Sequence, residues 1–263
     1  MFKLTSLNLN GIRSATSKGL EDWVAASAPD CICVQELKAQ PADLSGRFES
    51  LAGLTGYFQC AEKKGYSGVG VYTRHEPSDV VIGFDGGEFD AEGRCVELRF
   101  DTLTHKRSIL SVYFPSGSSG EDRQAAKYRF LAVFYPYLMQ LKSQREFIVC
   151  SDVNIAHQAK DLKNWRSNQK NSGFLPEERA WMTTALTEGG LVDVYRQLHP
   201  DTTDTCYTWW SNRGQAYANN VGWRLDYHLA TPALGATAQD VAIYKDVKFS
   251  DHAPVTVDYG FSM

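Results

Sequence analysis

An apolar run near the middle of the chain, Phe147-Ile148-Val149, leads directly to Asp152 and Asn154, and this stretch constrains the fold more than any other. The run is typical of a buried strand. Side chains two positions apart on an extended chain share a face, so the acid and the amide point the same way where the strand ends. Because ligands of α/β proteins bind at strand ends, Asp152 and Asn154 are the first candidates for chemistry.

Strand-like runs recur along the whole chain, whereas helical patterns are fewer. The other runs cover residues 3–8, 30–35, 95–100, 107–114, 206–210, 222–230, 240–244 and 253–258, and residues 65–73 fit a glycine-rich turn that leads into a strand. Helices fit residues 18–28 and 176–187, and a longer helix fits 122–143, where Pro136 should kink or split it. No Gly/Ser-rich or Pro-rich linker divides the chain. We therefore expect a single α/β domain, residues 1–263, with sheets packed on each other beneath helices.

Composition limits the possible partners and compartments. The hydrophobic fraction of 43% is enough to bury a sizeable core, and the formal charge of -4 argues against a protein that binds nucleic acid through an overall basic surplus. The six cysteines mostly lie in apolar runs without zinc-finger spacing, so we expect reduced thiols and no structural zinc. No leader-like segment and no run of about 20 apolar residues is present, so we expect a cytoplasmic protein, nucleoid-associated if bacterial, without a membrane partner.

Eight polar residues fall at the predicted ends of strands. They are Asn8, Glu36, Tyr113, Asp152, Asn154, Asp226, Asp251 and His252. Each has an ordinary structural explanation by itself, since Asn8 can begin a turn and Asp226 can pair with Arg224. Together, four carboxylates, two amides, a His and a Tyr at successive strand ends match the needs of phosphodiester hydrolysis.

These residue types suggest separate roles. A hard divalent ion needs one or two carboxylates, which Glu36 with Asp251 or Asn8 can supply. The attacking water needs a base or an orienting group, and the acid and amide of the central strand can provide it. Charge that develops on phosphorus needs a cation or a hydrogen-bond donor, and His252 held protonated by Asp226 meets that need.

Six stretches of the chain resemble, in order, the motifs of the exonuclease III family of AP endonucleases. They are residues 8–13 (Asn-Leu-Asn-Gly-Ile-Arg), 35–38 (Gln-Glu-Leu-Lys), 65–70 (Gly-Tyr-Ser-Gly-Val-Gly), 152–154 (Asp-Val-Asn), 222–227 (Gly-Trp-Arg-Leu-Asp-Tyr) and 250–252 (Ser-Asp-His). The match runs from residue 4 to about residue 258. The stretches 65–70 and 220–227 are more similar to the human-type branch of the family than to the exonuclease III branch.

The resemblance implies a four-layer α/β sandwich of two packed β-sheets flanked by helices, the fold of DNase I-like endonucleases, exonucleases and phosphatases. It also implies Mg²⁺-dependent hydrolysis of DNA, with Mn²⁺ as a possible substitute. In this family Glu36 would be the main metal ligand, with Asn8 and Asp251 near it.

The same resemblance implies catalytic roles at the other strand ends. Asp152 would activate the water, although tyrosine and histidine are alternative candidates for this role. Asn154 would position the water or the phosphate, and Tyr113 would contact the scissile phosphate. His252, paired with Asp226, would stabilise the transition state.

A polar connection, residues 158–172, is the expected DNA surface. It carries Lys160, Lys163, Arg166 and Lys170, with Asn164, Asn168 and Asn171 between them. Such a stretch can be an ordinary solvated loop, but beside a phosphodiesterase site Lys, Arg and amides are suited to follow a phosphate backbone. Asn168 and Asn171 match positions that contact DNA in the family. Arg13, Lys38, Tyr66 and Arg74 are expected to extend this surface.

Trp209, Trp223 and Leu225 match positions that line the family's pocket for an extruded abasic sugar. A sugar without its base fits a tight apolar pocket better than an intact nucleotide does, whereas the alternative role for these residues is core packing. The chain departs from the family at three positions. Trp209 replaces a smaller aromatic residue, Ser116 replaces Asn or Gln, and Arg213 replaces an apolar side chain that probes the duplex.

The sequence therefore favours a monomeric AP endonuclease acting on damaged duplex DNA, which cuts 5′ to an abasic site and has 3′-phosphodiesterase, 3′-phosphatase or 3′-to-5′ exonuclease side activities. The main alternative is a paralogue specialised in 3′-phosphatase or exonuclease activity that cuts abasic sites poorly. Hydrolysis of inositol phosphates or lipids, and binding of damaged DNA without catalysis, are the other classes considered.

Overall fold

The computed structural model describes all residues from 1 to 263. The strands are β1 Phe2–Asn8, β2 Cys31–Gln35, β3 Ser50–Leu51, β4 Leu54–Gln59, β5 Val69–Thr73, β6 Asp79–Ile82, β7 Cys95–Asp101, β8 Lys106–Tyr113, β9 Glu146–Asp152, β10 Val192–Asp193, β11 Trp209–Trp210, β12 Gly222–Trp223, β13 Asp226–Ala230, β14 Ala238–Ile243 and β15 Val255–Tyr259. The helices are α1 Ile12–Ser17, α2 Leu20–Ser27, α3 Pro41–Leu44, α4 Glu88–Ala91, α5 Glu121–Lys142, α6 Trp165–Asn168, α7 Pro176–Thr187, α8 Val194–Leu198 and α9 Pro232–Gly235, with one 3-10 turn at Ala159–Asp161.

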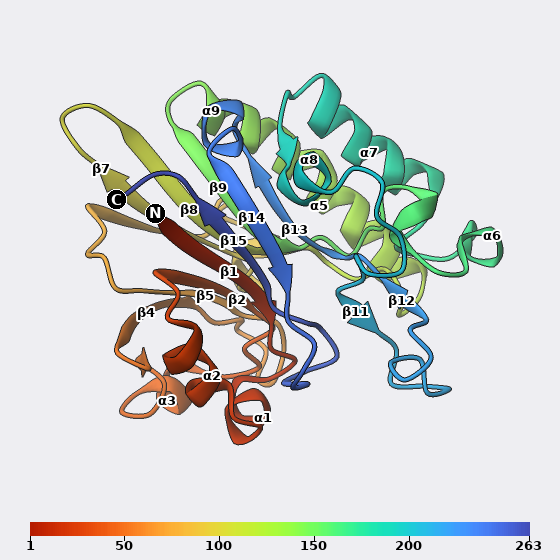
Figure 1. The fold of residues 1–263 in the computed structure, drawn as a ribbon, viewed down its shortest axis with the longest axis horizontal. Coiled ribbons are helices and arrows are strands. Elements are labelled where there is room, and N and C mark those ends of the chain that lie inside the picture. The colour runs from red at the N-terminus through yellow and green to blue at the C-terminus, as the bar shows by residue number, and fades with distance from the viewer.

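Two large mixed sheets form the middle of the molecule (Figure 1). One has seven strands in the order β14-β15-β1-β2-β5-β4-β3, and the other has six in the order β10-β13-β9-β8-β7-β6. The two sheets pack through buried apolar side chains, among them Leu4 and Cys33 from one sheet and Ile148 and Cys150 from the other. A short ribbon, β11 with β12, stands apart from both.

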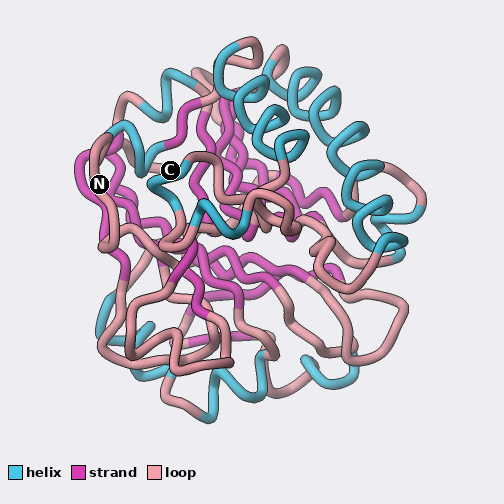
Figure 2. The backbone as a smooth tube through the Cα atoms, turned by 90° about the vertical axis from the view of Figure 1, so that its right-hand side faces the viewer, coloured by secondary structure: helices cyan, strands magenta, loops and turns pink.

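Helices cover the outer face of each sheet (Figure 2). Phe130 and Phe134 of α5 and Met182 of α7 pack with the six-stranded sheet, while Ile12 of α1 and Val24 of α2 pack with the seven-stranded one. The resulting order is helix, sheet, sheet, helix. This confirms the expected four-layer α/β sandwich.

The register of the strands brings the predicted site residues to one edge. β1 and β2 are parallel and align Asn8 with Gln35, so both strands end together. β8 and β9 are also parallel and align Tyr113 with Asp152, while antiparallel β13 aligns Asp226 with the same Asp152. The polar residues at these strand ends therefore meet although they are far apart in sequence.

The structure corrects several predicted elements. Pro136 does not split the long helix, because α5 is continuous across it and its buried face on either side, Phe134 and Leu138, packs into the core. The run 222–230 breaks after Trp223 because the backbone N–H of Arg224 turns to donate to the carbonyl of Asp161. Of the run 206–210, only its last two residues are in a strand, and α1 was not predicted.

Two further observations concern the environment of the chain. All six cysteines are free, and every one except Cys60 is buried. None of the helices combines the length and the apolarity that a membrane span requires.

Candidate active site

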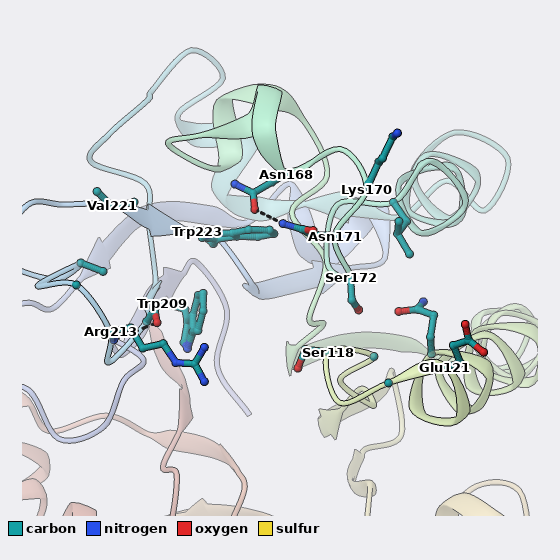
Figure 3. A pocket seen from close by; sticks show the side chains of 17 residues that line it. Ser118, Glu121, Asn168, Lys170, Asn171, Ser172, Trp209, Arg213, Val221 and Trp223 are labelled. Carbon is teal, nitrogen blue, oxygen red and sulfur yellow. Dashed lines mark hydrogen bonds between the residues drawn. The ribbon is translucent and has the colours of Figure 1, made fainter.

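Two adjoining cavities open at the edge where the strands end. The inner cavity has a volume of about 220 Å³ and is lined by Glu36, Tyr113, Ser116, Ser118, Asp152, Asn154, Ser172, Gly173, Trp209, Trp223, Leu225, Asp251 and His252. The outer cavity has a volume of about 900 Å³ and shares Ser118, Ser172, Trp209 and Trp223 with the inner one. Figure 3 shows the outer cavity, with both tryptophans across from Ser118 and Glu121.

Asp152 is held at the end of β9 by two amide groups. Its Oδ2 accepts from Asn8 Nδ2 at 2.9 Å, and its Oδ1 accepts from the backbone N–H of Asn154 at 2.9 Å. Asn154 reaches this position with a positive φ of 54°, and its own Nδ2 donates to the carbonyl of Phe114 at 3.0 Å. The acid and amide predicted to act together therefore lie in one tight turn.

His252 lies between two carboxylates. Its Nδ1 is 2.9 Å from Asp226 Oδ2, and its Nε2 is 3.6 Å from Asp152 Oδ2. Ser250 fixes the backbone here, since its Oγ accepts from the N–H of His252 at 2.9 Å and donates to the carbonyl of Asn8 at 2.6 Å. The predicted pair of His252 and Asp226 is thus present in the structure.

Burial and the mutual charges of His252, Asp226 and Asp152 shift the pKa values of His252 and Asp152. Burial lowers the pKa of His252, but the carboxylates of Asp226 and Asp152 outweigh burial and raise it to about 10. Burial also raises the pKa of Asp152 to about 7, with the charge of His252 opposing this and that of Asp226 adding to it. Between these two values the imidazole is protonated and Asp152 is ionised, so the site holds a cation beside a base.

Tyr113 ends β8 on the wall of the inner cavity. Burial, followed by the charges of Glu36 and Asp152, raises its pKa well above the ordinary value, so its hydroxyl stays a hydrogen-bond donor. The guanidinium of Arg94 lies 5.1 Å from the ring centroid and donates to the Tyr113 carbonyl at 2.9 Å. Sequence reasoning missed Arg94, which is fully buried.

Two of the three predicted metal ligands line the inner cavity. Glu36 and Asp251 both line it and offer the carboxylate oxygens that a hard divalent ion prefers. Asn8 is fully buried and does not line the cavity. Its Oδ1 accepts from the N–H of Asn10 at 2.9 Å and its Nδ2 faces Asp152, so Asn8 positions that acid, a role the sequence did not indicate. Metal ligation by Asn8 stays a prediction.

A second set of groups is close enough together to hold a metal ion. Asp152, Asp226 and His252 each offer one atom, and these atoms lie within 4.8 Å of one another. A histidine must be neutral to ligate a metal, however, and the carboxylates around His252 keep it protonated. These three groups fit a hydrogen-bonded charge cluster better than a metal site, so Glu36 and Asp251 are the better candidates for ligands.

Two tryptophan rings, which we call the aromatic wall, line the inner cavity. Trp209 and Trp223 pair across the β11–β12 ribbon, with their ring centroids 6.2 Å apart in an edge-to-face arrangement. Leu225 lies beside them and is almost completely buried. All three residues line the inner cavity, most of whose other lining residues are polar, and their role in holding an abasic sugar stays a prediction. Leu225 also packs into a small core with Ala156, Leu162 and Phe174.

The connection over residues 158–172 only partly follows the predicted DNA surface. Asn168, Lys170 and Asn171 line the outer cavity, as does Arg213. Asn171 Nδ2 donates to Asn168 Oδ1 at 2.7 Å, which Figure 3 shows as a dashed line. The other two lysines are engaged elsewhere, because Lys160 donates to the carbonyl of Pro200 and Lys163 pairs with Asp204 at 2.9 Å.

The remaining expected DNA contacts are distributed around the site. Exposed Arg13 pairs with Asp43, and Lys38 Nζ lies 3.2 Å from Glu36 Oε1 at the edge of the inner cavity. The hydroxyl of Tyr66 accepts from Arg94 at 2.8 Å and from Arg123 at 2.6 Å, so it is part of a structural network. DNA contacts by Arg13, Lys38 and Tyr66 stay predictions.

Arg74 does not extend the DNA surface. It follows the end of β5 that pairs with Cys31, at the opposite end of the sheet from the site, and donates to the carbonyl of Pro29 at 2.7 Å. The prediction failed because β5 runs antiparallel to β2, so its last residue points away from the strand ends that form the site.

Sequence reasoning also missed a buried ion pair behind the catalytic turn. Lys127 of α5 and Glu178 of α7 are both fully buried, with 2.7 Å between Nζ and Oε1. Lys127 Nζ also donates to the carbonyl of Asn154 at 2.7 Å, and Glu178 Oε2 accepts from the N–H of Gly173 at 2.7 Å. The sequence carried one signal, a lysine on the same helical stripe as Phe130 and Leu131.

Comparisons with known proteins agree with this geometry. The model of the Endonuclease/Exonuclease/phosphatase family matches residues 5–252. The chain is 36% identical to an exodeoxyribonuclease of Bacillus subtilis, over 96% of this chain and 97% of the relative. It is 38% identical to the DNA repair nuclease APEX1 of Danio rerio, over 97% of this chain and 81% of the relative.

Solved structures show the same fold. An AP endonuclease from Archaeoglobus fulgidus has a TM-score of 0.87 and 26% identity, covering 99% of this chain and 100% of that one. A 3′ phosphatase, NExo, from Neisseria has a TM-score of 0.86 over 99% of this chain and 100% of its own, and at 24% identity it supports the fold alone. From the family match and the near full-length relatives, the chain belongs to the Endonuclease/Exonuclease/phosphatase family.

Proposed function

We propose that the protein is a DNA-repair AP endonuclease that hydrolyses the phosphodiester 5′ to an abasic site in duplex DNA. The relatives named as exodeoxyribonuclease, APEX1 and AP endonuclease support this proposal. Removal of blocked 3′ ends is proposed as a side activity, since the same groups can act at a strand terminus.

One observation carries the proposal, namely the mixed lining of the inner cavity. Trp209, Trp223 and Leu225 contribute apolar surface to it, and the charged pair of Asp152 and His252 forms what we call its charged side. A deoxyribose without its base is small and apolar enough for such a space, and a nucleotide that has lost its base costs least to extrude. The phosphate attached to that sugar would then lie against the charged side.

The residues of the charged side can carry out the reaction. Ionised Asp152 accepts a proton from the attacking water, and Asn154 beside it orients the water or a phosphate oxygen. Protonated His252 and the Tyr113 hydroxyl stabilise the negative charge that develops on the phosphate. The water oxygen bonds to phosphorus as the P–O3′ bond breaks, and the released O3′ takes a proton from solvent. The products are a 3′-hydroxyl and a 5′-deoxyribose phosphate.

The metal is proposed to be Mg²⁺, with Mn²⁺ as a substitute. Glu36 and Asp251 would hold it, and Asn8 lies close behind Asp152. When bound, such an ion neutralises phosphate charge and stabilises the leaving oxygen.

The outer cavity is proposed as the surface that receives the duplex. Asn168, Lys170, Asn171 and Arg213 supply amide and cationic groups suited to phosphate oxygens. All proposed site residues belong to one chain, so a monomer is sufficient. DNA as the substrate and six free cysteines support a cytoplasmic location.

The proposal is tested with three duplex oligonucleotides, carrying an internal abasic analogue, a 3′-phosphate or no lesion, each with Mg²⁺ and with EDTA. The expected result is metal-dependent cleavage 5′ to the internal analogue, with slower release of the 3′-phosphate. Activity on the 3′-phosphate alone would favour the alternative, a paralogue specialised in 3′-end processing. If none of the duplexes is cleaved in a metal-dependent way, the proposal that the protein is a nuclease is wrong.

A further inference from the structure

The indole of Trp209 links the aromatic wall to a carboxylate that lines the inner cavity. Its ring lines both cavities, and its Nε1–H donates to Asp251 Oδ2 at 3.1 Å. Trp223, the partner of Trp209 in the β11–β12 ribbon, also lines the inner cavity, but its indole makes no hydrogen bond. One tryptophan of the wall thus contacts a carboxylate of the charged side, and the other does not.

Backbone contacts on both sides hold the main chain of Trp209 in place. Trp209 forms an isolated β-bridge with His252, and the next residue, Trp210, donates its backbone N–H to the carbonyl of Asp251 at 3.1 Å. On its other side Trp209 pairs with Trp223 in the β11–β12 ribbon. Because the chain is fixed on both sides, the indole N–H is preorganised toward the carboxylate.

Neutral donors hold both oxygens of Asp251. Asn10 Nδ2 donates to Oδ1 at 3.0 Å, while Trp209 holds Oδ2. Asn10 Oδ1 in turn accepts from Lys38 Nζ at 2.5 Å, and that ammonium lies 3.2 Å from Glu36. A continuous chain of contacts therefore runs from the aromatic wall through Asp251 to Glu36.

We propose that Trp209 is a positioning residue that orients Asp251 for cation binding, which makes the aromatic wall and the metal side one coupled unit. This inference rests on the proposed function, because it takes Asp251 to be a metal ligand. Groups that hydrogen-bond to a metal ligand fix its orientation, and their loss commonly weakens metal binding by about 10- to 100-fold. By linkage, a sugar that presses on Trp209 alters cation affinity and the cation alters sugar affinity.

The test measures Mn²⁺ binding to the full-length, DNA-free protein, with free Mn²⁺ quantified by electron paramagnetic resonance. Trp209→Phe keeps an aromatic wall but removes the N–H, and Trp223→Phe is its matched control on the same wall. Asp251→Asn and the double variant with Trp209→Phe complete a cycle. Urea unfolding of each variant confirms that it is folded.

We expect Trp209→Phe to weaken Mn²⁺ binding about tenfold and Trp223→Phe to stay within about twofold of wild type. In the Asp251→Asn background, Trp209→Phe should add nothing, because it acts through that carboxylate. Unchanged binding in Trp209→Phe together with weaker binding in Asp251→Asn would overturn this inference alone. Unchanged binding in Asp251→Asn would also remove Asp251 from the proposed metal site.

Discussion

Two buried charge clusters meet in one short motif, where Arg224 belongs to one and Asp226 to the other. The Arg224 cluster consists of Arg224, Arg196, Asp161 and Asp193, and the His252 cluster consists of His252, Asp152 and Asp226. Both are built from aspartates and cations that are buried, apart from the partly exposed Arg196. They differ in how completely the charges are matched.

The Arg224 cluster is balanced. Two guanidinium groups face two carboxylates, with Arg224 Nε 2.8 Å from Asp161 and its terminal nitrogens 3.0 and 2.6 Å from Asp193. Burial raises the pKa of Asp161, but Arg224 and Arg196 outweigh burial and lower it to about 2. Asp161 therefore stays ionised at neutral pH, and we assign the cluster to holding the fold.

The His252 cluster has one more carboxylate than cations. Asp226 Oδ1 is buried without a hydrogen-bond partner, and the pKa of Asp152 is raised to about 7 rather than lowered. A group whose pKa lies near working pH can exchange a proton with substrate. The comparison shows that similar residue types become structural or reactive according to whether their charges balance.

Arg224→Met should have the largest effect, because it leaves two buried aspartates short of a partner. Removing one member of a buried ion pair costs about 3–5 kcal/mol of unfolding free energy. Urea denaturation followed by tryptophan fluorescence measures this loss. A change below about 1 kcal/mol, the size expected of a surface pair, would contradict the structural role.

His252→Ala should act on the rate instead. Loss of one group that stabilises transition-state charge typically lowers kcat by about 10²- to 10³-fold. Single-turnover incision of an abasic duplex measures the rate, and fluorescence anisotropy with the same duplex in EDTA measures affinity. A defect confined to affinity would mean that His252 only positions the DNA.

The pH profile of kcat/KM should reflect the ionisation of the His252 cluster and not that of the Arg224 cluster. Asp152 must be ionised to accept a proton and His252 protonated to stabilise charge, so kcat/KM should fall about tenfold per unit below pH 7 and again above pH 10. The matched variant Asp193→Asn should keep both limbs, since it belongs to the balanced cluster. A wild-type profile that stays flat across this range would contradict these assignments.

The sequence predicted the residues of the His252 cluster far better than those of the Arg224 cluster. Asp152, Asp226 and His252 could be found because each is a polar residue within or directly beside a strand-like run, where local patterning is visible. Asp161 lies in a polar connection 63 residues from Arg224, and nothing local marks it as buried. Its pairing depends on how that connection folds back on the sheet.

Individual side-chain contacts were likewise harder to predict than the arrangement of strands and helices. The layers of the fold followed from strand and helix periodicity, so the sandwich was predictable. The bond from Trp209 to Asp251 spans 42 residues and depends on the orientation of a single ring. The periodicity of apolar residues carries no information on such an orientation. It also does not show that β5 runs antiparallel to β2, which places Arg74 away from the site.

The most direct test compares one Asp→Asn change in each cluster. The measurement is the single-turnover rate of incision at an internal abasic analogue with Mg²⁺, for Asp226→Asn and for Asp193→Asn. An asparagine at position 226 cannot hold the imidazolium, so that variant should be about 10²-fold slower than the other. Equal rates, or a slower Asp193→Asn enzyme, would contradict the assignment of catalysis to the His252 cluster.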